Sequence, residues 1–244
     1  MSAKTIVITG AGMGIGAETA RHLAAGNRLL LHYHSSAETA LALQAELKPL
    51  CASVDVVAAD LTTDDGCLSL FRTVSTQFDA LDVLVNNAGG MIERQAVEDL
   101  DWRHLSDTFA LNTFSAMRLT GLCTGLLRHG SNPCVVNVTS IAMRHGAPTA
   151  TAYGAAKSAL DAFTRGAANE LAPHIRVNAV APGIIDTRFH ERVTSPEKMR
   201  QFVDSTPLKR AGTVVDVART ITFLIDNEFM TGETVDCNGG LSMR

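Results

Sequence analysis

The chain has 244 residues, of which 46% are hydrophobic and 5% aromatic, and it contains 19 glycines. This composition is typical of an aliphatic α/β core, and the length suits one domain, because no Pro/Gly/Ser-rich linker or block of charge divides the sequence. The net charge of -4 gives no electrostatic reason to expect nucleic acid or an anionic membrane surface as a partner, so we expect a small-molecule ligand.

The cysteines and the N-terminus indicate the compartment. The five cysteines are widely spaced, with no CxxC pair and no His at metal-ligand spacing, which predicts reduced thiols and no metal site. The opening residues, MSAKTIVITGAG, contain an apolar run too short for a signal peptide, and no run approaches the length of a membrane span. We therefore expect a cytoplasmic protein with no membrane segment.

A glycine-rich turn follows the first predicted strand. Residues 4–9 (KTIVIT) predict a strand, and GAGMGIG runs directly into ETARHLAAG, which has helical periodicity. In this context a helix N-terminus can face a pyrophosphate. The spacing TGxxxGxG is formed by Thr9, Gly10, Gly14 and Gly16. Gly10 would permit the tight turn, Gly14 the approach to the pyrophosphate and Gly16 close helix packing, although the glycines could also serve only a tight βα turn.

The second predicted strand, residues 28–33, bears on the choice of cofactor. An NAD site usually offers an acidic residue near this strand end for the adenine ribose, and none occurs before Glu38. The residues available instead are neutral or potentially cationic donors: Tyr33, His34, Ser35 and Ser36. These donors suit a 2′-phosphate better, so we favour NADP over NAD. Met13, in the glycine-rich turn, is not the basic residue that would strengthen a phosphate pocket.

Two further strands end in polar or small residues. The third, residues 54–59, leads into Asp60 and Leu61, which could border an adenine, although Asp60 could equally be a solvated loop carboxylate. A helix over residues 63–78 follows. The fourth strand, residues 81–85, closes with Asn86, Asn87, Ala88 and Gly89. The adjacent amides can join the strand end to neighbouring backbone, and the small residues let a ligand approach.

A long apolar stretch, residues 101–128, predicts one helix with Asn112 in its middle. Asparagine is unfavourable inside a helix. Two interpretations stay open: Asn112 is a satisfied buried amide, or it bends the helix and exposes a carbonyl to water.

The stretch from Ser140 to Lys157 predicts a proton-transfer site. Ser140 closes an apolar strand, residues 135–139, and Tyr153 and Lys157 stand four residues apart on the helix that follows, which places them on one face. The ammonium of Lys157 would favour the phenolate and lower the Tyr153 pKa from about 10. Tyr153 could then exchange a proton with a substrate oxygen that Ser140 holds.

The last third of the chain completes an alternating pattern. A strand over residues 175–180 leads into APGIIDT, where Pro182 and Gly183 set a turn and Thr187 could bond a carboxamide. The polar stretch 188–207 has the character of a substrate lid, or of an ordinary surface helix and loop. A helix over 214–225 and a strand over 234–237 follow. Seven strands alternating with helices predict one parallel sheet covered on both faces.

The ordered set of motifs resembles the short-chain dehydrogenase/reductase (SDR) family. It comprises TGAGMGIG, Asp60, NNAG, Asn112, Ser140, YGAAK, PGIIDT and the terminal NGG, and it covers essentially the whole chain. The resemblance implies a single Rossmann-type domain over residues 1–244, with a doubly wound parallel sheet in the order 3-2-1-4-5-6-7. It also implies a catalytic tetrad of Asn112, Ser140, Tyr153 and Lys157.

The resemblance also implies a role for each member of the tetrad. Tyr153 would be the general acid in carbonyl reduction and the base in alcohol oxidation, and Ser140 would orient the substrate oxygen. Lys157 would hold the nicotinamide ribose and polarise Tyr153, and Asn112 would anchor a water that links Lys157 to solvent. The residues expected at the cofactor are Thr9, Gly10, Gly14, Ile15, Gly16, Tyr33, His34, Ser35, Ser36, Asp60, Leu61, Asn87, Ala88, Gly89, Tyr153, Lys157, Pro182, Gly183, Ile185 and Thr187.

The nearest general likeness is to 3-oxoacyl-carrier-protein reductases and to sugar or polyol dehydrogenases. The leading hypothesis is therefore an NADP-dependent reductase of a carbonyl, such as a 3-oxoacyl thioester. An acyl carrier protein would need basic residues near the site, and the candidates are Arg94, Arg144, His145, Arg188 and Arg192, although such scattered residues could also be ordinary surface residues. The alternatives are NAD-dependent oxidation of a sugar, polyol or other secondary alcohol, and a catalytically silent ligand-binding scaffold, against which the intact Ser140, Tyr153 and Lys157 argue.

The family is usually tetrameric through the helix that carries Tyr153, so the resemblance implies a homotetramer. That helix is rich in small residues, which would allow close helix approach: Ala155, Ala156, Ala159, Ala162, Ala167 and Ala168. A helix buried within one chain would show the same pattern.

Overall fold

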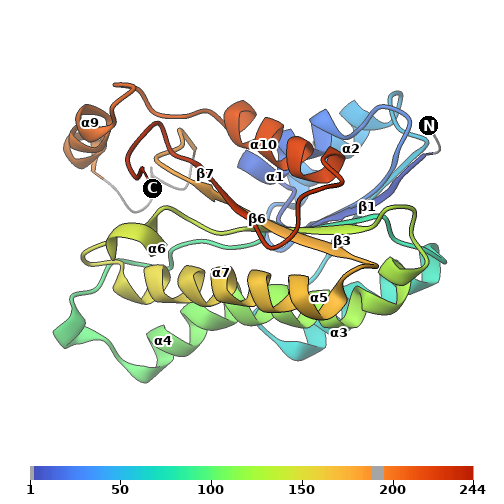
Figure 1. Ribbon diagram of the computed structural model, residues 1–244, viewed down its shortest axis with the longest axis horizontal. Helices are drawn as coiled ribbons and strands as arrows, with labels where there is room; N and C mark the ends of the chain where they lie inside the picture. The colour runs from blue at the N-terminus through green and yellow to red at the C-terminus, as the bar shows by residue number, and fades with distance from the viewer. Residues whose placement is uncertain (1–2, 188–194, 244) are drawn as a thin grey trace.

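The computed structural model describes residues 3–187 and 195–243, and a seven-stranded parallel sheet runs through its centre (Figure 1). The strands are β1 (Thr5–Ile8), β2 (Arg28–Tyr33), β3 (Ser53–Ala58), β4 (Val83–Asn86), β5 (Cys134–Val138), β6 (Arg176–Pro182) and β7 (Thr234–Cys237). All neighbouring strands are parallel, in the order β3-β2-β1-β4-β5-β6-β7. The expected fold class and strand order are confirmed.

Helices cover both faces of this sheet (Figure 1). One face carries α1 (Gly14–His22), α2 (Ala37–Leu47) and α10 (Val214–Asp226). The other carries α3 (Asp64–Gln77), α4 (Trp102–Phe109), α5 (Ser115–Arg128) and α7 (Thr151–Leu171). Three short helices, η1 (Val97–Asp99), α6 (Ala142–His145) and α9 (Pro196–Ser205), lie in the connections.

The core forms because the central strands are buried on both faces. β1, β4, β5 and β6 are buried along their whole length, as expected for a parallel sheet between two helical layers. Side chains alternate across a strand, so β1 sends Ile6 and Ile8 into one hydrophobic cluster and Val7 into the other. The two clusters make the sheet a rigid platform for the loops at its ends.

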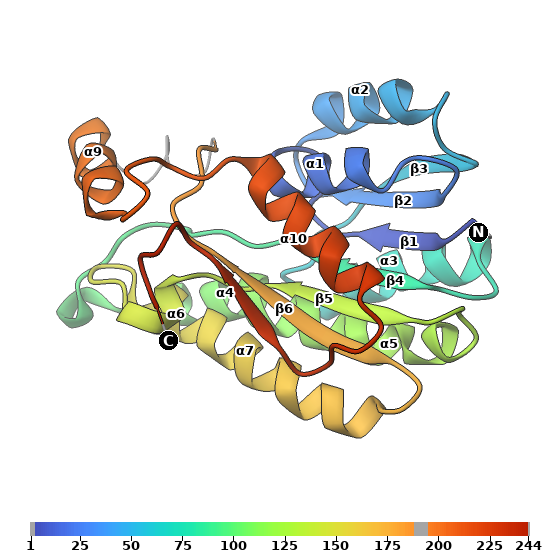
Figure 2. The ribbon, with the colours of Figure 1, turned by 45° about the horizontal axis from the view of Figure 1, so that its top comes forward.

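The functional motifs gather at one end of the sheet, because parallel strands have their carboxyl ends on the same side. In Figure 2 the amino terminus lies at one end of the strands, and α6, α9 and the carboxyl terminus lie at the opposite end. The strand order reverses between β1, which pairs with β2, and β4, which continues to β5. Such a reversal leaves a crevice outside the carboxyl ends, where open α/β sheets bind their ligands.

The single helix expected over residues 101–128 is interrupted. A π turn, η2 (Ala110–Phe114), separates α4 from α5, with Asn112 at its centre. The Asn112 side chain donates a hydrogen bond over 2.9 Å to the Thr108 carbonyl of the preceding turn. An extra residue in the turn is a frequent way for a helix to accommodate a functional side chain.

The stretch expected to form a lid is described only in part. Residues 188–194 of the lid lie outside the described residues, whereas most of the remainder forms the helix α9.

All five cysteines are free, and Cys67, Cys123 and Cys134 are buried, as expected for unpaired thiols. Within residues 3–187 and 195–243, no helix is long and apolar enough to cross a membrane.

Candidate functional site

A cavity of about 850 Å³ opens at the carboxyl ends of the central strands. Its wall includes Gly10 after β1, Ala88 after β4, Ser140 after β5 and Gly183 after β6. Most of the residues that the sequence assigned to the nicotinamide and pyrophosphate line it: Gly10, Gly14, Ile15, Asn87, Ala88, Gly89, Ser140, Tyr153, Lys157, Pro182, Gly183, Ile185 and Thr187. The residues expected at the cofactor and in the tetrad therefore lie together on one wall, although they make up less than half of the residues that line it.

The glycine-rich turn has a geometry that suits a bound pyrophosphate. Gly10 and Gly14 have φ angles of 64° and 60°, in the left-handed region that favours glycine. A Cβ atom on Gly10 would lie 2.9 Å from the Ala88 Cα, whereas one on Gly14 would approach only Thr187, at 4.0 Å, among the described residues. Backbone atoms thus pack closely against Gly10, whereas the space next to Gly14 is open. The helix α1 begins there, and the N–H groups of its first turn can bind an anion.

Asn87 joins the turn after β4 to the turn after β1. Its side chain donates to the carbonyls of Thr9 and Gly10 over 2.9 Å and 3.0 Å. In return, the Thr9 hydroxyl accepts from the backbone N–H groups of Asn87 and Ala88 over 3.0 Å and 2.9 Å. The prediction that amides here join the strand end to neighbouring backbone is confirmed.

His32 supports the same turn and was not identified from the sequence. It is 2% exposed, its Nδ1 accepts a hydrogen bond from the Gly10 N–H over 3.1 Å, and its Nε2 lies 3.0 Å from the Ala59 carbonyl. Burial lowers the His32 pKa, so the neutral ring can serve both partners. The only sequence signal was a polar residue inside the apolar run RLLLHY.

The residues expected at the adenosine end lie outside the cavity wall. Ser36 is half-buried and its Oγ occupies the space that a side chain at Gly12 would need, so the glycine lets Ser36 reach the glycine-rich turn. The Asp60 carboxylate accepts from the Thr62 hydroxyl and N–H, and these bonds lower its pKa. Leu61 is 4% exposed and packs in the core.

Ser140, Tyr153 and Lys157 converge on the cavity. The Ser140 hydroxyl forms a hydrogen bond with Tyr153 and accepts one from the Ala142 N–H over 3.1 Å. Lys157 is 3% exposed and its Nζ donates to the Val138 carbonyl over 2.8 Å. The same Nζ lies 6.0 Å from the centre of the Tyr153 ring. A strand end and a helix therefore bring two hydroxyls and an amine together.

Asn112 lies behind these groups rather than on the cavity wall. Its amide donates to the Gly90 carbonyl over 2.8 Å and accepts from the Gly90 N–H over 2.9 Å. A Cβ atom on Gly89 would lie 2.9 Å from both Asn112 Oδ1 and Lys157 Nζ, so the two polar atoms meet beside this turn. Asn112 is a satisfied buried amide and also the centre of the π turn, so the first interpretation and the expected break in the helix are both observed, whereas the link to a water stays a prediction.

The expectation that Lys157 lowers the Tyr153 pKa is wrong for this structure. Burial raises the Tyr153 pKa, and the hydrogen bond with Ser140 opposes this rise only in part. Burial also lowers the Lys157 pKa to about 7, because a charged amine is unfavourable away from water. A partly neutral amine cannot favour the phenolate as a full positive charge would.

Several residues of the cavity wall were not named from the sequence. Apolar ones among them are Met91, Ile141, Ile184, Phe202 and Leu241. Lys198, Phe202 and Ser205 of α9 also line the cavity. Ile141 and Ile184 adjoin Ser140 and Gly183, and α9 lies in the stretch 188–207 that was expected to form a lid or an ordinary surface helix and loop, but nothing in the sequence marked these individual side chains.

The expected basic rim is corrected by the structure. Arg94 and His145 line the cavity. Arg144 does not line it, because its side chain is 12% exposed and bonded to Asp236 of β7. Arg188 and Arg192 lie outside the described residues. Among the described residues, no three or more His, Cys, Asp or Glu side chains gather in a way that could hold a metal ion.

Comparisons with known proteins extend the likeness over the whole chain. Residues 10–242 match the family described as enoyl-(acyl carrier protein) reductase. A 3-oxoacyl-[acyl-carrier-protein] reductase of Synechocystis sp. (strain ATCC 27184 / PCC 6803 / Kazusa) is 34% identical over 252 residues, covering 100% of this chain and 98% of the relative.

Two solved structures share the fold at similar coverage. A short-chain type dehydrogenase/reductase from Mycobacterium ulcerans has a TM-score of 0.90 and 29% identity, over 99% of this chain and 91% of that chain. An NAD⁺-bound xylitol dehydrogenase has a TM-score of 0.90 and 27% identity, over 98% of this chain and 99% of that chain. The likeness therefore includes the strands beyond the glycine-rich turn.

Proposed function

Because the chain belongs to the short-chain dehydrogenase/reductase family of NAD(P)-dependent oxidoreductases, we propose that it uses NADPH to reduce a carbonyl group to a secondary alcohol. One observation carries the proposal. A single cavity joins the glycine-rich turn at Gly14 to Ser140, Tyr153 and Lys157. Carbonyl reduction needs a hydride donor and a proton donor at one place, and this cavity offers a site for each.

The proposed roles follow from the contacts of each side chain. When bound, the nicotinamide supplies the hydride for the carbonyl carbon. Ser140 orients the carbonyl oxygen and Tyr153 donates its proton to that oxygen. The raised Tyr153 pKa keeps the phenol protonated at neutral pH, which suits a proton donor. The protonated form of Lys157, which is only partly populated near pH 7 and lies 6.0 Å from the ring centre, then stabilises the phenolate that remains.

The preference for NADP rests on the residues after β2. Ser36 contacts the glycine-rich turn, His34 and Ser35 are exposed beside it, and the first carboxylate after β2 is Glu38. A 2′-phosphate would find hydroxyl and imidazole donors there. The second candidate is an NAD-dependent polyol dehydrogenase, which the likeness to the NAD⁺-bound xylitol dehydrogenase favours.

The apolar part of the cavity favours an acyl chain over a polyol. Met91, Phe202 and Leu241 offer no hydrogen bonds to a row of hydroxyls. A 3-oxoacyl thioester would place its chain against these side chains and its carbonyl at Tyr153. We propose that residues 188–207 act as the substrate lid, because α9 contributes Lys198 and Phe202 to the wall.

The function is tested first by cofactor binding. NADPH is expected to raise the melting temperature of the purified protein more than NADH does at equal concentration, because ligand binding to the native state stabilises it by mass action. An acetoacetyl thioester should then be reduced at the expense of NADPH. A larger shift with NADH, together with oxidation of polyols, would replace the leading function by the second candidate.

Gly89→Ala is expected to lower kcat by about 10-fold or more and to lower the melting temperature, because the hydrogen-bonded Asn112 cannot move freely. The new Cβ would lie 2.9 Å from Lys157 Nζ, the mobile end of a long side chain, and from Asn112 Oδ1. The lysine can move aside, but it then leaves its position near Tyr153. Steady-state kinetics and thermal melting measure the two effects.

The matched control is Gly90→Ala, whose Cβ would meet none of the described atoms within 4 Å. Its kcat should stay within about twofold of the wild type. Equal losses of kcat in the two variants would contradict the placement of Lys157 and Asn112 around Gly89.

Arg94→Glu is expected to weaken reduction of a 3-oxoacyl group on an acyl carrier protein by about 10-fold, through a higher KM, while reduction of a small free thioester changes little. Arg94 lines the cavity rim, and acyl carrier proteins are acidic partners that a new carboxylate would repel. Arg72→Glu, on the exposed side of α3, is the control. Equal KM values for wild type and Arg94→Glu would exclude docking at this residue.

We propose a homotetramer in which α5 and α7 contact other copies. On α7 the residues Ala155, Ala162 and Gly166 are exposed and small, and on α5 Met117 is 39% exposed. Such a surface allows helices to pack closely. Light scattering at micromolar concentration is expected to give about four times the 25.9 kDa chain mass, and a monomer mass would contradict the proposal.

A further inference from the structure

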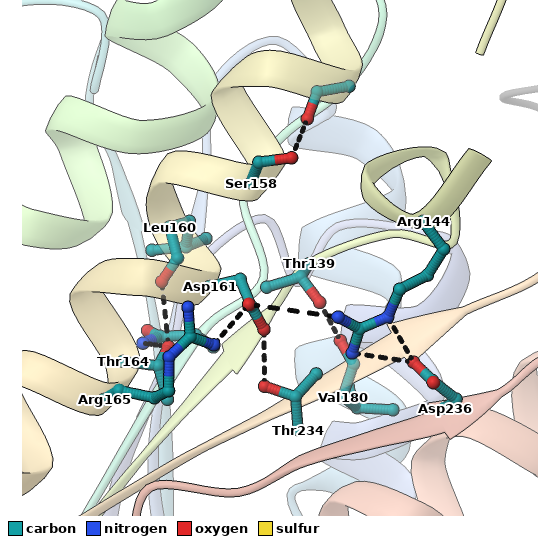
Figure 3. A network of polar contacts seen from close by, with 12 residues as sticks. Thr139, Arg144, Ser158, Leu160, Asp161, Thr164, Arg165, Val180, Thr234 and Asp236 are labelled. Carbon is teal, nitrogen blue, oxygen red and sulfur yellow. Dashed lines mark hydrogen bonds and ion pairs between the residues drawn. The ribbon is translucent and has the colours of Figure 1, made fainter. Parts of the chain in front are cut away.

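Four charged side chains meet between α6, α7 and β7 (Figure 3). Arg144 comes from α6, Asp161 and Arg165 come from α7, and Asp236 comes from β7. The hydroxyl of Thr234, also on β7, joins the same group. Three elements distant in sequence are therefore linked through polar side chains.

The contacts pair each carboxylate with a guanidinium. Arg144 donates to Asp236 Oδ1 from Nε over 3.2 Å and from Nη2 over 3.1 Å, and its Nη1 lies 4.0 Å from Asp161 Oδ2. Arg165 Nη1 donates to the same oxygen of Asp161 over 2.5 Å, and Thr234 donates to the other oxygen over 2.7 Å. The two positive and two negative charges balance.

The members of this network differ in exposure. The side chains of Asp161, Arg144 and Asp236 are 8%, 12% and 16% exposed, whereas that of Arg165 is 55% exposed. Exposed ion pairs contribute little to stability, but a buried pair that loses one partner leaves a charge without compensation. Loss of Arg144 would remove the guanidinium from the half-buried Asp236 and from buried Asp161, whereas loss of Arg165 would affect a contact at the surface of the chain.

The network lies on the same two segments as the proposed proton-transfer groups. Asp161 follows Lys157 by four residues and Tyr153 by eight, so the three share one face of α7. Arg144 follows Ser140 by four residues, on the short helix that begins after it. The ion pairs therefore connect the segment that carries Ser140 to the helix face that carries Tyr153.

The strand β7, which carries Asp236, extends this connection to the turn after β6. Asp236 precedes Cys237, whose carbonyl accepts a hydrogen bond from the Gly183 N–H over 2.9 Å. A Cβ atom on Gly183 would lie 2.6 Å from the Asn238 Cα, so the two segments pack closely. Gly183 lines the cavity. The network thus contacts two segments that build the wall, α6 and α7, and it adjoins a third, the turn after β6, through β7.

We propose that Arg144 is a positioning residue, which fixes the separation of the Ser140 and Tyr153 hydroxyls by holding α6 against Asp161 of α7 and Asp236 of β7. The inference rests on the proposed function, because it concerns the roles of these two hydroxyls. Arg144 acts through other residues, since it lies outside the cavity wall. A merely structural role would lower the melting temperature and leave the turnover of the folded protein unchanged.

The test compares two replacements of arginine by methionine. Arg144→Met is expected to lower kcat by about 10- to 100-fold, with the KM for NADPH within about threefold of the wild type, because a small displacement of reacting groups is costly. Arg165→Met makes the same change at the exposed partner and should keep kcat within about twofold. Arg144→Lys should have a kcat between those of Arg144→Met and the wild type, because lysine keeps the positive charge but cannot donate to Asp236 from two nitrogens as arginine does.

A titration of tyrosine supplies a readout that needs no substrate. The chain has two tyrosines, so subtracting the titration of Tyr153→Phe from that of each protein leaves the tyrosinate absorbance of Tyr153. The midpoint is expected to shift by about half a pH unit or more in Arg144→Met and not in Arg165→Met. A failure of the proposed function, seen as no turnover of any carbonyl by the wild type, is thereby separated from a failure of this inference.

The outcomes are distinct. Loss of melting temperature in Arg144→Met, with kcat and the Tyr153 midpoint as in the wild type, would overturn the positioning role. If Arg144→Met does not fold, the double variant Arg144→Met with Asp236→Asn removes one charge of each sign and takes its place. The same loss of kcat and shift of midpoint are then expected, and wild-type values in the double variant would overturn the inference.

Discussion

Tyr153→Phe is expected to lower kcat by about 10²- to 10⁴-fold, the range that general acid catalysis contributes, while the affinity for NADPH stays within about twofold. The change removes one hydroxyl and leaves the ring in place. That hydroxyl is the partner of Ser140 in the cavity, and its raised pKa keeps the proton available for transfer. Apart from Ser140, we assign no side chain of the cavity a direct contact with the carbonyl oxygen.

Two measurements separate chemistry from folding in Tyr153→Phe. Steady-state turnover gives kcat, and the thermal shift with NADPH shows whether the cofactor still binds. A retained shift with lost turnover is the expected result. A kcat within about threefold of the wild type would assign the proton to another donor and would favour the ligand-binding scaffold if cellular function were also unaltered.

Lys157→Met is expected to lower kcat by about 10²-fold or more and to remove a pH dependence of stability. In the folded protein without cofactor, burial lowers the Lys157 pKa to about 7, whereas an unfolded lysine titrates near 10.4. Between these values the unfolded chain binds a proton that the folded chain lacks, so the free energy of unfolding rises with pH. Below pH 7 Lys157 is protonated in both the folded and the unfolded state. Its contribution to the free energy of unfolding is then constant and at its lowest.

Chemical denaturation at pH 7 and pH 9 tests this dependence. For the wild type without cofactor the Lys157 contribution to the free energy of unfolding should increase by about 2 kcal/mol between these values, because each pH unit is worth up to about 1.4 kcal/mol. Lys157→Met should lack that increase, since methionine does not titrate. An equal pH dependence in the two proteins would show that Lys157 is charged in the folded state.

The features that could be predicted from the sequence are those determined by a local pattern of residues. Alternation of apolar strands and helices predicted the parallel sheet, and the resemblance to the SDR family implied the strand order. The role of Asn87 was also predictable, because adjacent amides at a strand end must find backbone partners, and it donates to Thr9 and Gly10. These features depend on neighbours in sequence or on the topology alone.

Features that depend on tertiary burial were not predictable. The Tyr153 and Lys157 pKa values are set by desolvation, which spacing on a helix does not reveal. Arg144 was assigned to the rim as a basic residue that could meet an acyl carrier protein, but the turn into α6 directs it to Asp236, 92 residues away. His32 was overlooked because its partners, Gly10 and Ala59, come from two other segments.

The most direct test of the central claim is the consumption of NADPH by the purified protein with an acetoacetyl thioester, followed against Tyr153→Phe. The account predicts NADPH-dependent reduction that exceeds the rate with NADH and is lost in the variant. No turnover of the thioester, together with NAD⁺-dependent oxidation of a polyol, would contradict the proposed cofactor and substrate. It would also mean that Ser35, Ser36 and His34 bind no phosphate.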